Sequence, residues 1–226
     1  MVIIYSSGRS GTNLSLEILT GHSYFEPSKQ PEDKLLFKRD IVYPEKYLCK
    51  SDTVYCKSFT EFYSFMVKNR DAKIIWTIRQ PYDWCLSKLY RGRPLEKRGW
   101  KPADDGTIEG CLEDIEHMSD ILFNGLYHFK DRILIVKMED VLRDITKATE
   151  RMCKFIGIEL EDSMLRPWER MRHQGKKERY GNKIHTSQID LYKDIDKIYG
   201  GYFKETDLSE LFEKMLPLCK FFKYKV

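Results

Sequence analysis

The chain begins with the stretch Val2-Ile3-Ile4-Tyr5-Ser6-Ser7-Gly8-Arg9-Ser10-Gly11-Thr12-Asn13, in which an apolar run leads into a loop of small residues. A helix-like pattern follows, so residues 2–6 are predicted as a strand and residues 12–20 as a helix. Gly8 and Gly11 permit a tight turn, and the free N–H groups at the start of a helix attract anions with the help of the helix dipole. The stretch therefore predicts a loop that binds phosphate.

The residues of this loop distinguish it from the loop of kinases and ATPases. A Walker loop reads G-x-x-x-x-G-K-[ST], and its Lys reaches the outer phosphates. Here Thr12 follows Gly11, and the cation lies inside the loop as Arg9. A planar guanidinium matches two oxygens of a phosphate or sulfate and stays charged. The alternative is an ordinary turn with a solvated Arg9, which the position between a strand and a helix disfavours.

Length and charge bound the class of protein. The 226 residues suit one α/β domain, which we place at residues 1–226. The formal net charge of +4 fits anionic ligands without requiring nucleic acid. The N-terminal apolar run is too short for a signal peptide or a membrane span, and no basic segment precedes it. We therefore expect a soluble cytoplasmic protein with neither a nucleic-acid partner nor a membrane partner.

The cysteines are scattered, with no C-x-x-C pair and no histidine at metal-ligand spacing. We expect reduced thiols, several of them in the core, and no metal site. The six residues are Cys49, Cys56, Cys85, Cys111, Cys153 and Cys219.

Apolar runs alternate with helical patterns, as a parallel sheet with crossover helices requires. Several runs are apolar on both faces, which is typical of strands covered by helices on two sides. The expected fold is α/β with three layers, in which helices flank a central parallel sheet as in P-loop proteins. We predict strands at residues 2–6, 23–26, 53–57, 73–78 and 132–137. We predict helices near residues 12–20, 60–69, 82–91, 108–129 and 139–156 and beyond 189, and loops at 27–50 and 166–186.

A second anion-binding point is predicted at the end of another apolar strand. Arg79 directly follows this strand, Pro81 begins a turn or a helix, and Ser87 lies two helical turns further on. In open parallel sheets ligands gather at the carboxyl ends of the strands, so Arg79 and the first loop belong to the same edge. Two anion-binding points at one edge suggest a ligand with two separated charged groups.

These residues resemble the sulfotransferases that use 3′-phosphoadenosine 5′-phosphosulfate (PAPS). Residues 7–12 are similar to the 5′-phosphosulfate loop of that family in its Arg-containing form. The spacing from Arg79 to Ser87 is similar to the family's 3′-phosphate site. The resemblance implies a P-loop-like sulfotransferase fold with PAPS as co-substrate, adenosine 3′,5′-bisphosphate as product and no metal.

A third segment completes the resemblance. Residues 133–144, which run into residues 153–158, resemble the family's strand, its E-D-L-x-x-D helix start and its F-L-G-I ending. The three segments occur in the family's order. We assign the Glu139-Asp140 pair to structure, because acidic groups at a helix start complement the dipole and cap free N–H groups.

The resemblance also implies a role for the matching residues. The backbone from Arg9 to Asn13 and the Thr12 hydroxyl would hold the 5′-phosphosulfate. Arg79 and Ser87 would hold the 3′-phosphate, which ATP lacks. The implied donor-binding residues are Gly8, Arg9, Ser10, Gly11, Thr12, Asn13, Arg79 and Ser87.

In-line displacement at sulfur requires cations that neutralise charge on the leaving oxygens. Arg9 is the first candidate. Lys57 is the second, because residues 54–58 resemble the strand that carries a lysine towards the sulfuryl group in related enzymes. A Lys57 that merely ends a strand and faces water is the alternative.

The reaction also requires a base that takes the proton of the acceptor. Family members use a His two residues beyond the strand lysine or a Glu after the first helix. The first position is Phe59 here, which cannot accept a proton. This favours Glu26 as the catalytic base, with His22 and Glu61 behind it.

The acceptor is expected to be a hydroxyl or amine of a carbohydrate or small molecule. Residues 88–118 combine basic and aromatic side chains, which suit an anionic sugar, a phenolic acceptor or a solvated loop equally. The basic segment 166–186 suits a lid over the donor as well as a solvated loop. Within it, residues 175–177 and 181–183 are both candidates for closing over the donor.

Two other classes of protein share parts of this pattern. A P-loop kinase needs a Lys after Gly11 and a carboxylate for magnesium, and neither is found in place. A non-catalytic nucleotide-binding or RNA-binding protein would explain the basic loops but not Arg79 and Ser87. Preference for adenosine 3′,5′-bisphosphate over ATP with magnesium distinguishes the sulfotransferase from both.

Overall fold

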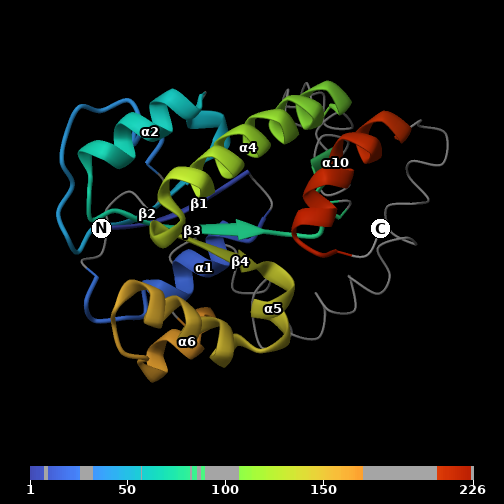
Figure 1. The fold of residues 1–226 in the computed structure, drawn as a ribbon. Coiled ribbons are helices and arrows are strands. Elements are labelled where there is room, and N and C mark those ends of the chain that lie inside the picture. The colour runs from blue at the N-terminus through green and yellow to red at the C-terminus, as the bar shows by residue number, and fades with distance from the viewer. Residues whose placement is uncertain are drawn as a thin grey trace, which may run out of the picture.

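In a computed structural model of the chain, the residues described are 1–7, 10–25, 33–56, 58–81, 83–85, 88–89, 107–169 and 208–224. Their strands form one parallel sheet in the order β2-β1-β3-β4 (Figure 1). The fold is therefore α/β with a central parallel sheet, as predicted. The strands are β1 (Val2–Ser6), β2 (Leu48–Asp52), β3 (Lys73–Ile78) and β4 (Ile133–Lys137).

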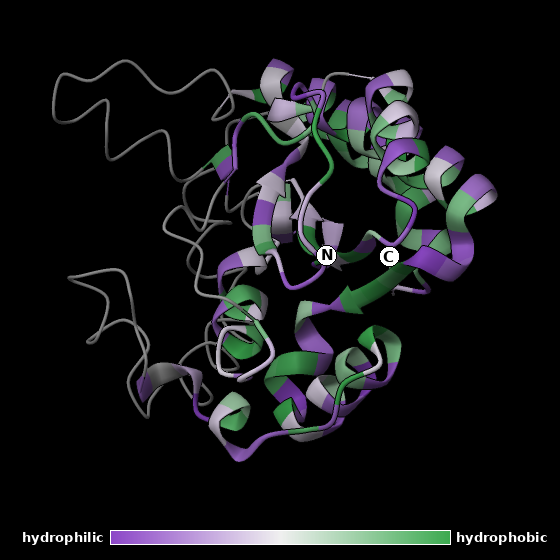
Figure 2. Ribbon diagram, turned by 90° about the vertical axis from the view of Figure 1, so that its left-hand side faces the viewer, coloured by the Kyte–Doolittle hydropathy of each residue, from purple (hydrophilic) through white to green (hydrophobic). Residues whose placement is uncertain are grey.

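Helices cover both faces of the sheet. Figure 1 shows α2, α4 and α10 on one face and α1, α5 and α6 on the other, and Figure 2 shows these layers from the side. The helices are α1 (Thr12–Leu19), α2 (Phe59–Lys68), α4 (Ile108–Phe129), α5 (Met138–Arg143), α6 (Ile145–Ile156) and α10 (Ser209–Phe221). Short 3₁₀ turns are η1 (Thr53–Tyr55), η3 (Lys130–Arg132), η4 (Asp162–Leu165) and η5 (Pro167–Glu169).

The alternation of side chains along β1 divides the core into two layers. Ile3 and Tyr5 join the core beneath α2, α4 and α10, whereas Val2 and Ile4 join the core beneath α1, α5 and α6. All four are buried, since successive strand residues point to opposite faces and both faces are covered. Tyr5 meets Trp76 edge-on with ring centroids 4.7 Å apart. The sheet therefore packs against a hydrophobic core on each of its two faces.

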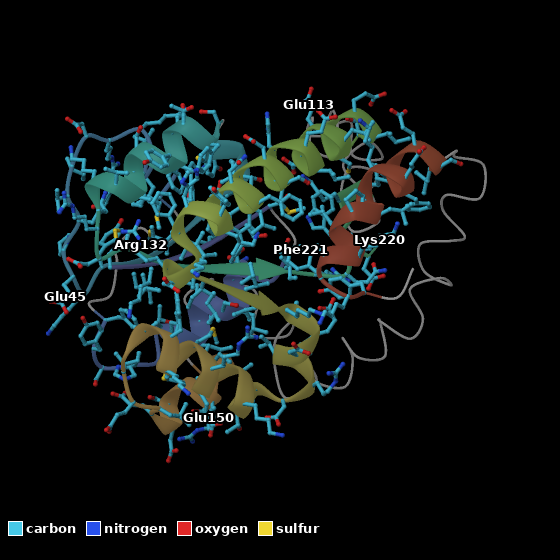
Figure 3. The ribbon with its side chains drawn as sticks, in the orientation of Figure 1. Glu45, Glu113, Arg132, Glu150, Lys220 and Phe221 are labelled. Carbon is cyan, nitrogen blue, oxygen red and sulfur yellow. The ribbon has the colours of Figure 1, made fainter. Side chains whose placement is uncertain are left out.

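The C-terminal helix packs against the longest helix of the described chain. Phe221 of α10, which Figure 3 labels, meets Phe123 of α4 edge-on, with ring centroids 4.9 Å apart. Beyond α10, the Lys137 ammonium at the end of β4 donates to the Phe222 carbonyl. The C-terminal segment is thereby attached to the edge of the sheet where β4 ends.

The predicted strand at residues 23–26 is wrong for residues 23–25, which form a turn. The Ser23 amide donates to the Glu161 carboxylate at 2.9 Å, and the Ser23 hydroxyl donates to the same carboxylate. The Tyr24 amide donates to His22 Nδ1 at 2.8 Å. These bonds use backbone donors that a strand would offer to a neighbouring strand. Glu26 itself lies outside the described residues.

The predicted strand at residues 53–57 is also wrong for residues 53–56, because β2 ends just before them, at Asp52. Lys57 itself lies outside the described residues. Val2 pairs with Leu48 and Ser6 pairs with Asp52, so β2 uses the whole length of β1. Residues 53–55 therefore have no part of β1 left to pair with and form the turn η1. The strand Leu-Cys-Lys-Ser-Asp is difficult to predict from sequence, because its last three residues are polar.

The predicted helix at residues 139–156 is two helices. Asp144 has a non-helical φ of −152°, and its carboxylate accepts the Lys147 amide at 3.0 Å as the N-cap of α6. α5 ends just before it, at Arg143. The predicted helix at 82–91 is described in part, since residues 81, 83–85 and 88–89 are helical.

All six cysteines are buried and unpaired, as predicted. Burial raises the pKa of Cys56 to about 12 and that of Cys153 to about 11, so these thiols stay protonated near neutral pH. Among the described helices, none is long and apolar enough to cross a membrane. The described part of the chain also holds no group of three or more potential metal-ligating side chains.

Candidate active site

The two predicted anion-binding points follow neighbouring strands. Tyr5 of β1 pairs with Trp76 of β3, and the strands run in the same direction. The loop after β1 and Arg79 after β3 therefore leave the sheet at the same edge. This juxtaposition is the one that the sequence predicted, and it is the geometry in which open parallel sheets bind ligands.

The helix that follows the first loop has an uncapped N-terminus. Among the α-helices that Figure 1 labels, α1 has neither a capping side chain nor an acidic residue in its first turn. By contrast, Ser58 caps α2, Thr107 caps α4 and Asp144 caps α6. The N–H groups at the start of α1 are thus not taken by a capping side chain, which suits them to an anion.

Gly11 is required at this N-terminus for two reasons. Its φ of 89° lies in the left-handed region, which strains any side chain. A Cβ at Gly11 would also overlap the Met138 sulfur at the start of α5. The glycine therefore permits both the turn into α1 and the close approach of α5.

Buried polar atoms collect around the same edge of the sheet. Among the described residues, Ser6 Oγ, Asn13 Oδ1 and Thr77 Oγ1 are buried and have no hydrogen-bond partner. Ser6 and Thr77 stand at the carboxyl ends of β1 and β3, and Asn13 lies in the first turn of α1. Buried polar atoms without partners are uncommon, and a bound ion or a catalytic role is among the explanations for them.

The segment that carries Arg79 is held from two sides. The Gln80 amide donates to Glu139 Oε1 at 2.7 Å, and the Gln80 side chain accepts the Asp83 amide at 2.8 Å. The helical residues begin at Pro81, for which the first helical position is favourable. Arg79 is half-buried, and its Nε atom is fully enclosed.

Glu139 does more than the helix-start role predicted for it. No side chain caps α5, although Glu139 and Asp140 lie in its first turn and complement its dipole. Glu139 instead accepts the Gln80 amide and, at 2.9 Å, the Tyr224 hydroxyl. Sequence reasoning missed these contacts, because the partners are distant along the chain.

Asp114 is a second residue that sequence reasoning missed. It is buried on α4 and accepts the Ser7 hydroxyl at 2.9 Å, beside the first loop. The signal in the sequence is a carboxylate that interrupts the apolar stripe formed by Cys111, Ile115 and Met118.

Several predicted site residues lie outside the described residues: Gly8, Arg9, Glu26, Lys57 and Ser87. Their immediate neighbours are described. Lys57 lies between the buried Cys56 and Ser58, the N-cap of α2. Ser87 directly precedes the buried Lys88. The roles of these five residues stay predictions.

His22, an alternative base, is engaged at both ring nitrogens. Its Nδ1 accepts the Tyr24 amide at 2.8 Å, which places the ring proton on Nε2, 2.8 Å from the Glu159 carbonyl. Nearby, the Ser23 hydroxyl and amide hold the pKa of Glu161 below its ordinary value of 4.5. This network fixes the turn that leads to Glu26, which suits His22 to structure more than to proton transfer.

Glu61, the other alternative, lies in the first turn of α2. Its amide donates to the Ser58 hydroxyl at 3.3 Å, so its backbone forms part of the N-cap. An acidic residue here complements the dipole of α2. Like His22, Glu61 has a structural role that explains its position.

The chain belongs to the sulfotransferase family. A sequence profile described as "Sulfotransferase family" matches residues 43–162, more than half of the chain. This match covers β2 to the start of η4, including Arg79 and the third segment of the resemblance. No curated protein matches the sequence.

Solved structures with the same fold are also sulfotransferases. The sulfotransferase domain from the curacin biosynthetic pathway is 17% identical, with a TM-score of 0.65 over 100% of this chain and 98% of that chain. The domain from the Synechococcus PCC 7002 olefin synthase is 17% identical, with a TM-score of 0.64 over 100% and 95%. Mouse sulfotransferase SULT7A1, solved with PAP, is 17% identical, with a TM-score of 0.51 over 74% and 61%. At these identities the likeness shows the fold.

Proposed function

We propose that this sulfotransferase uses PAPS as its donor and transfers the sulfuryl group to a hydroxyl or amine of a carbohydrate or small molecule. The observation that carries the proposal is the placement of the uncapped α1 N-terminus and of Arg79 at one edge of the sheet. A donor with a phosphate on the 3′ oxygen and a phosphosulfate on the 5′ oxygen of its ribose needs two anion-binding points. We further propose that residues 1–226 act as a single domain.

In this proposal the first turn of α1 binds the 5′-phosphosulfate. The backbone amides from Arg9 to Asn13 and the Thr12 hydroxyl donate hydrogen bonds to its oxygens. Gly8 and Gly11 keep the backbone close to the ligand. Arg79 and Ser87 bind the 3′-phosphate, for which the guanidinium offers two parallel donors. Mouse SULT7A1, solved with PAP, supports a donor of this kind.

The proposed chemical step is an in-line displacement at sulfur. The acceptor oxygen or nitrogen forms a bond to sulfur while the bond from sulfur to the phosphate oxygen breaks, and adenosine 3′,5′-bisphosphate leaves. Glu26 takes the acceptor proton. Arg9 and Lys57 neutralise the charge that develops on the leaving oxygens. None of these roles requires a metal ion.

Calorimetric titration tests the donor. We expect micromolar binding of adenosine 3′,5′-bisphosphate without magnesium, weaker binding of ATP with magnesium, and loss of bisphosphate binding in Arg79→Ala. Arg143→Ala is the matched control, because Arg143 is exposed at the end of α5 and pairs with Asp140. Preference for ATP with magnesium would overturn the proposal and favour a phosphotransferase. Equal loss in both variants would remove Arg79 from the site.

A further inference from the structure

The stripe of α4 that faces the core contains a buried carboxylate. Asp114 is 6% exposed and lies among Cys111, Ile115 and Met118, which are also buried. A carboxylate is rarely buried unless it is paired, because removing its charge from water is costly. Its partners therefore explain why this position is polar.

A single oxygen of Asp114 binds two partners. Oδ2 accepts the Ser7 hydroxyl at 2.9 Å and also pairs with the Lys88 ammonium. The Lys88 side chain is 2% exposed, and its ammonium lies 5.1 Å from the centre of the Trp84 ring. The three groups are enclosed together, so their interactions are little weakened by water.

The two partners of Asp114 belong to the two halves of the proposed donor site. Ser7 directly precedes Gly8 of the first loop, and Lys88 directly follows Ser87. The segments are far apart in sequence, and Asp114 comes from a third segment, α4. The Asp114 carboxylate therefore connects the first loop, the proposed site of the 5′-phosphosulfate, to the helical segment that follows Arg79.

We propose that Asp114 is a positioning residue that couples the 5′-phosphosulfate loop to the 3′-phosphate segment. The inference rests on the proposed function. Because Oδ2 holds both partners, a shift of one segment changes the hydrogen-bond geometry available to the other. Filling either half of the site then favours the arrangement that the other half needs, and the effect is reciprocal.

The test uses a probe that reaches only one half of the site. Adenosine 3′-monophosphate carries the 3′-phosphate and no 5′ group. Ser7→Ala removes the hydroxyl at the other half and leaves the Asp114–Lys88 pair. We expect this variant to bind the probe about 5-fold or more weakly, the lower range of measured couplings. Ser15→Ala is the matched control, because the Ser15 hydroxyl is equally buried and has no partner among the described residues. It should leave the affinity for the probe unchanged.

Two further variants separate coupling from stability. In an Asp114→Leu background, where position 114 has no oxygen to accept the Ser7 hydroxyl, Ser7→Ala should have no additional effect on the affinity for the probe. The double change Lys88→Met with Asp114→Leu replaces the buried pair by apolar groups of similar size, which tends to preserve folding. We expect it to stay folded by circular dichroism and to bind the 3′ probe as weakly as Ser7→Ala.

The outcomes distinguish this inference from the donor assignment. If the wild type binds no adenosine 3′,5′-bisphosphate, the proposed function fails and the coupling with it. If the wild type binds it and Ser7→Ala leaves the affinity for the 3′ probe unchanged, the coupling alone is overturned. If the double variant Lys88→Met with Asp114→Leu binds adenosine 3′-monophosphate as tightly as the wild type, the Asp114–Lys88 pair has only a structural role.

Discussion

Glu139 and Gln80 are joined by a hydrogen bond of 2.7 Å between a carboxylate oxygen and a backbone amide. The residue that follows Arg79 is thus held by the first turn of α5. The other oxygen of Glu139 accepts the Tyr224 hydroxyl at 2.9 Å. Through Glu139, the C-terminal segment therefore supports the segment after β3 that carries Arg79, the residue proposed to bind the 3′-phosphate.

Removal of this carboxylate should loosen the segment that holds Arg79. We expect Glu139→Ala to weaken the binding of adenosine 3′,5′-bisphosphate and to lower stability by about 1.5–3 kcal/mol, the usual contribution of hydrogen bonds to a charged group. Calorimetric titration and urea unfolding measure both effects. Asp140→Ala is the control, since its carboxylate faces Arg143 at the surface. Equal effects in the two variants would contradict a special role for Glu139.

Substitution of Gly11 should destabilise the protein more than substitution of a glycine with similar backbone geometry. Gly11→Ala introduces strain at φ 89° and overlap with Met138. Gly157→Ala introduces strain at φ 88° only, because nothing lies within 4 Å of its Cβ. We expect Gly157→Ala to lose about 1–2 kcal/mol and Gly11→Ala to lose more. Urea unfolding measures the difference, and equal losses would show that Met138 moves aside freely.

Loss of the proposed base should abolish turnover while binding persists. We expect Glu26→Gln to lower kcat by about 10²-fold or more, because proton transfer to a positioned base contributes that much. The affinity for adenosine 3′,5′-bisphosphate should stay unchanged, since the amide has the same size. Glu45→Gln is the matched control, because Glu45 is exposed and binds the Tyr24 hydroxyl. Unchanged turnover in Glu26→Gln would remove this residue from the mechanism.

Glu161 should make the stability of the protein sensitive to acid. Its folded pKa lies below the ordinary 4.5, since the Ser23 hydroxyl and amide bind the ionised form. The stabilisation is thus complete above pH 4.5 and is lost as the pH falls through the lower folded pKa. We expect Glu161→Gln to remove this part of the pH dependence in unfolding measured from pH 6 to pH 3. An unchanged slope in this range would contradict the assignment.

The sequence predicted the elements whose patterns are local. The strands β1, β3 and β4 were recognisable because their apolar runs face a core on both sides. The turn into α1 was recognisable because its glycines lie in a loop of small residues between an apolar run and a helical pattern. β2 was missed, since an edge strand can carry Lys50 and Asp52 once β1 supplies its hydrogen bonds.

The sequence by itself determined the order of strand, loop and helix and the placement of Arg79 at a strand end, because these features depend on neighbouring residues. Only the tertiary structure decided which distant groups support them. It brought Glu139 to Gln80 and Asp114 to Ser7, pairs separated by 59 and 107 positions. Such pairs form when helices from separate parts of the chain pack on the sheet, and no local pattern encodes the choice of partner.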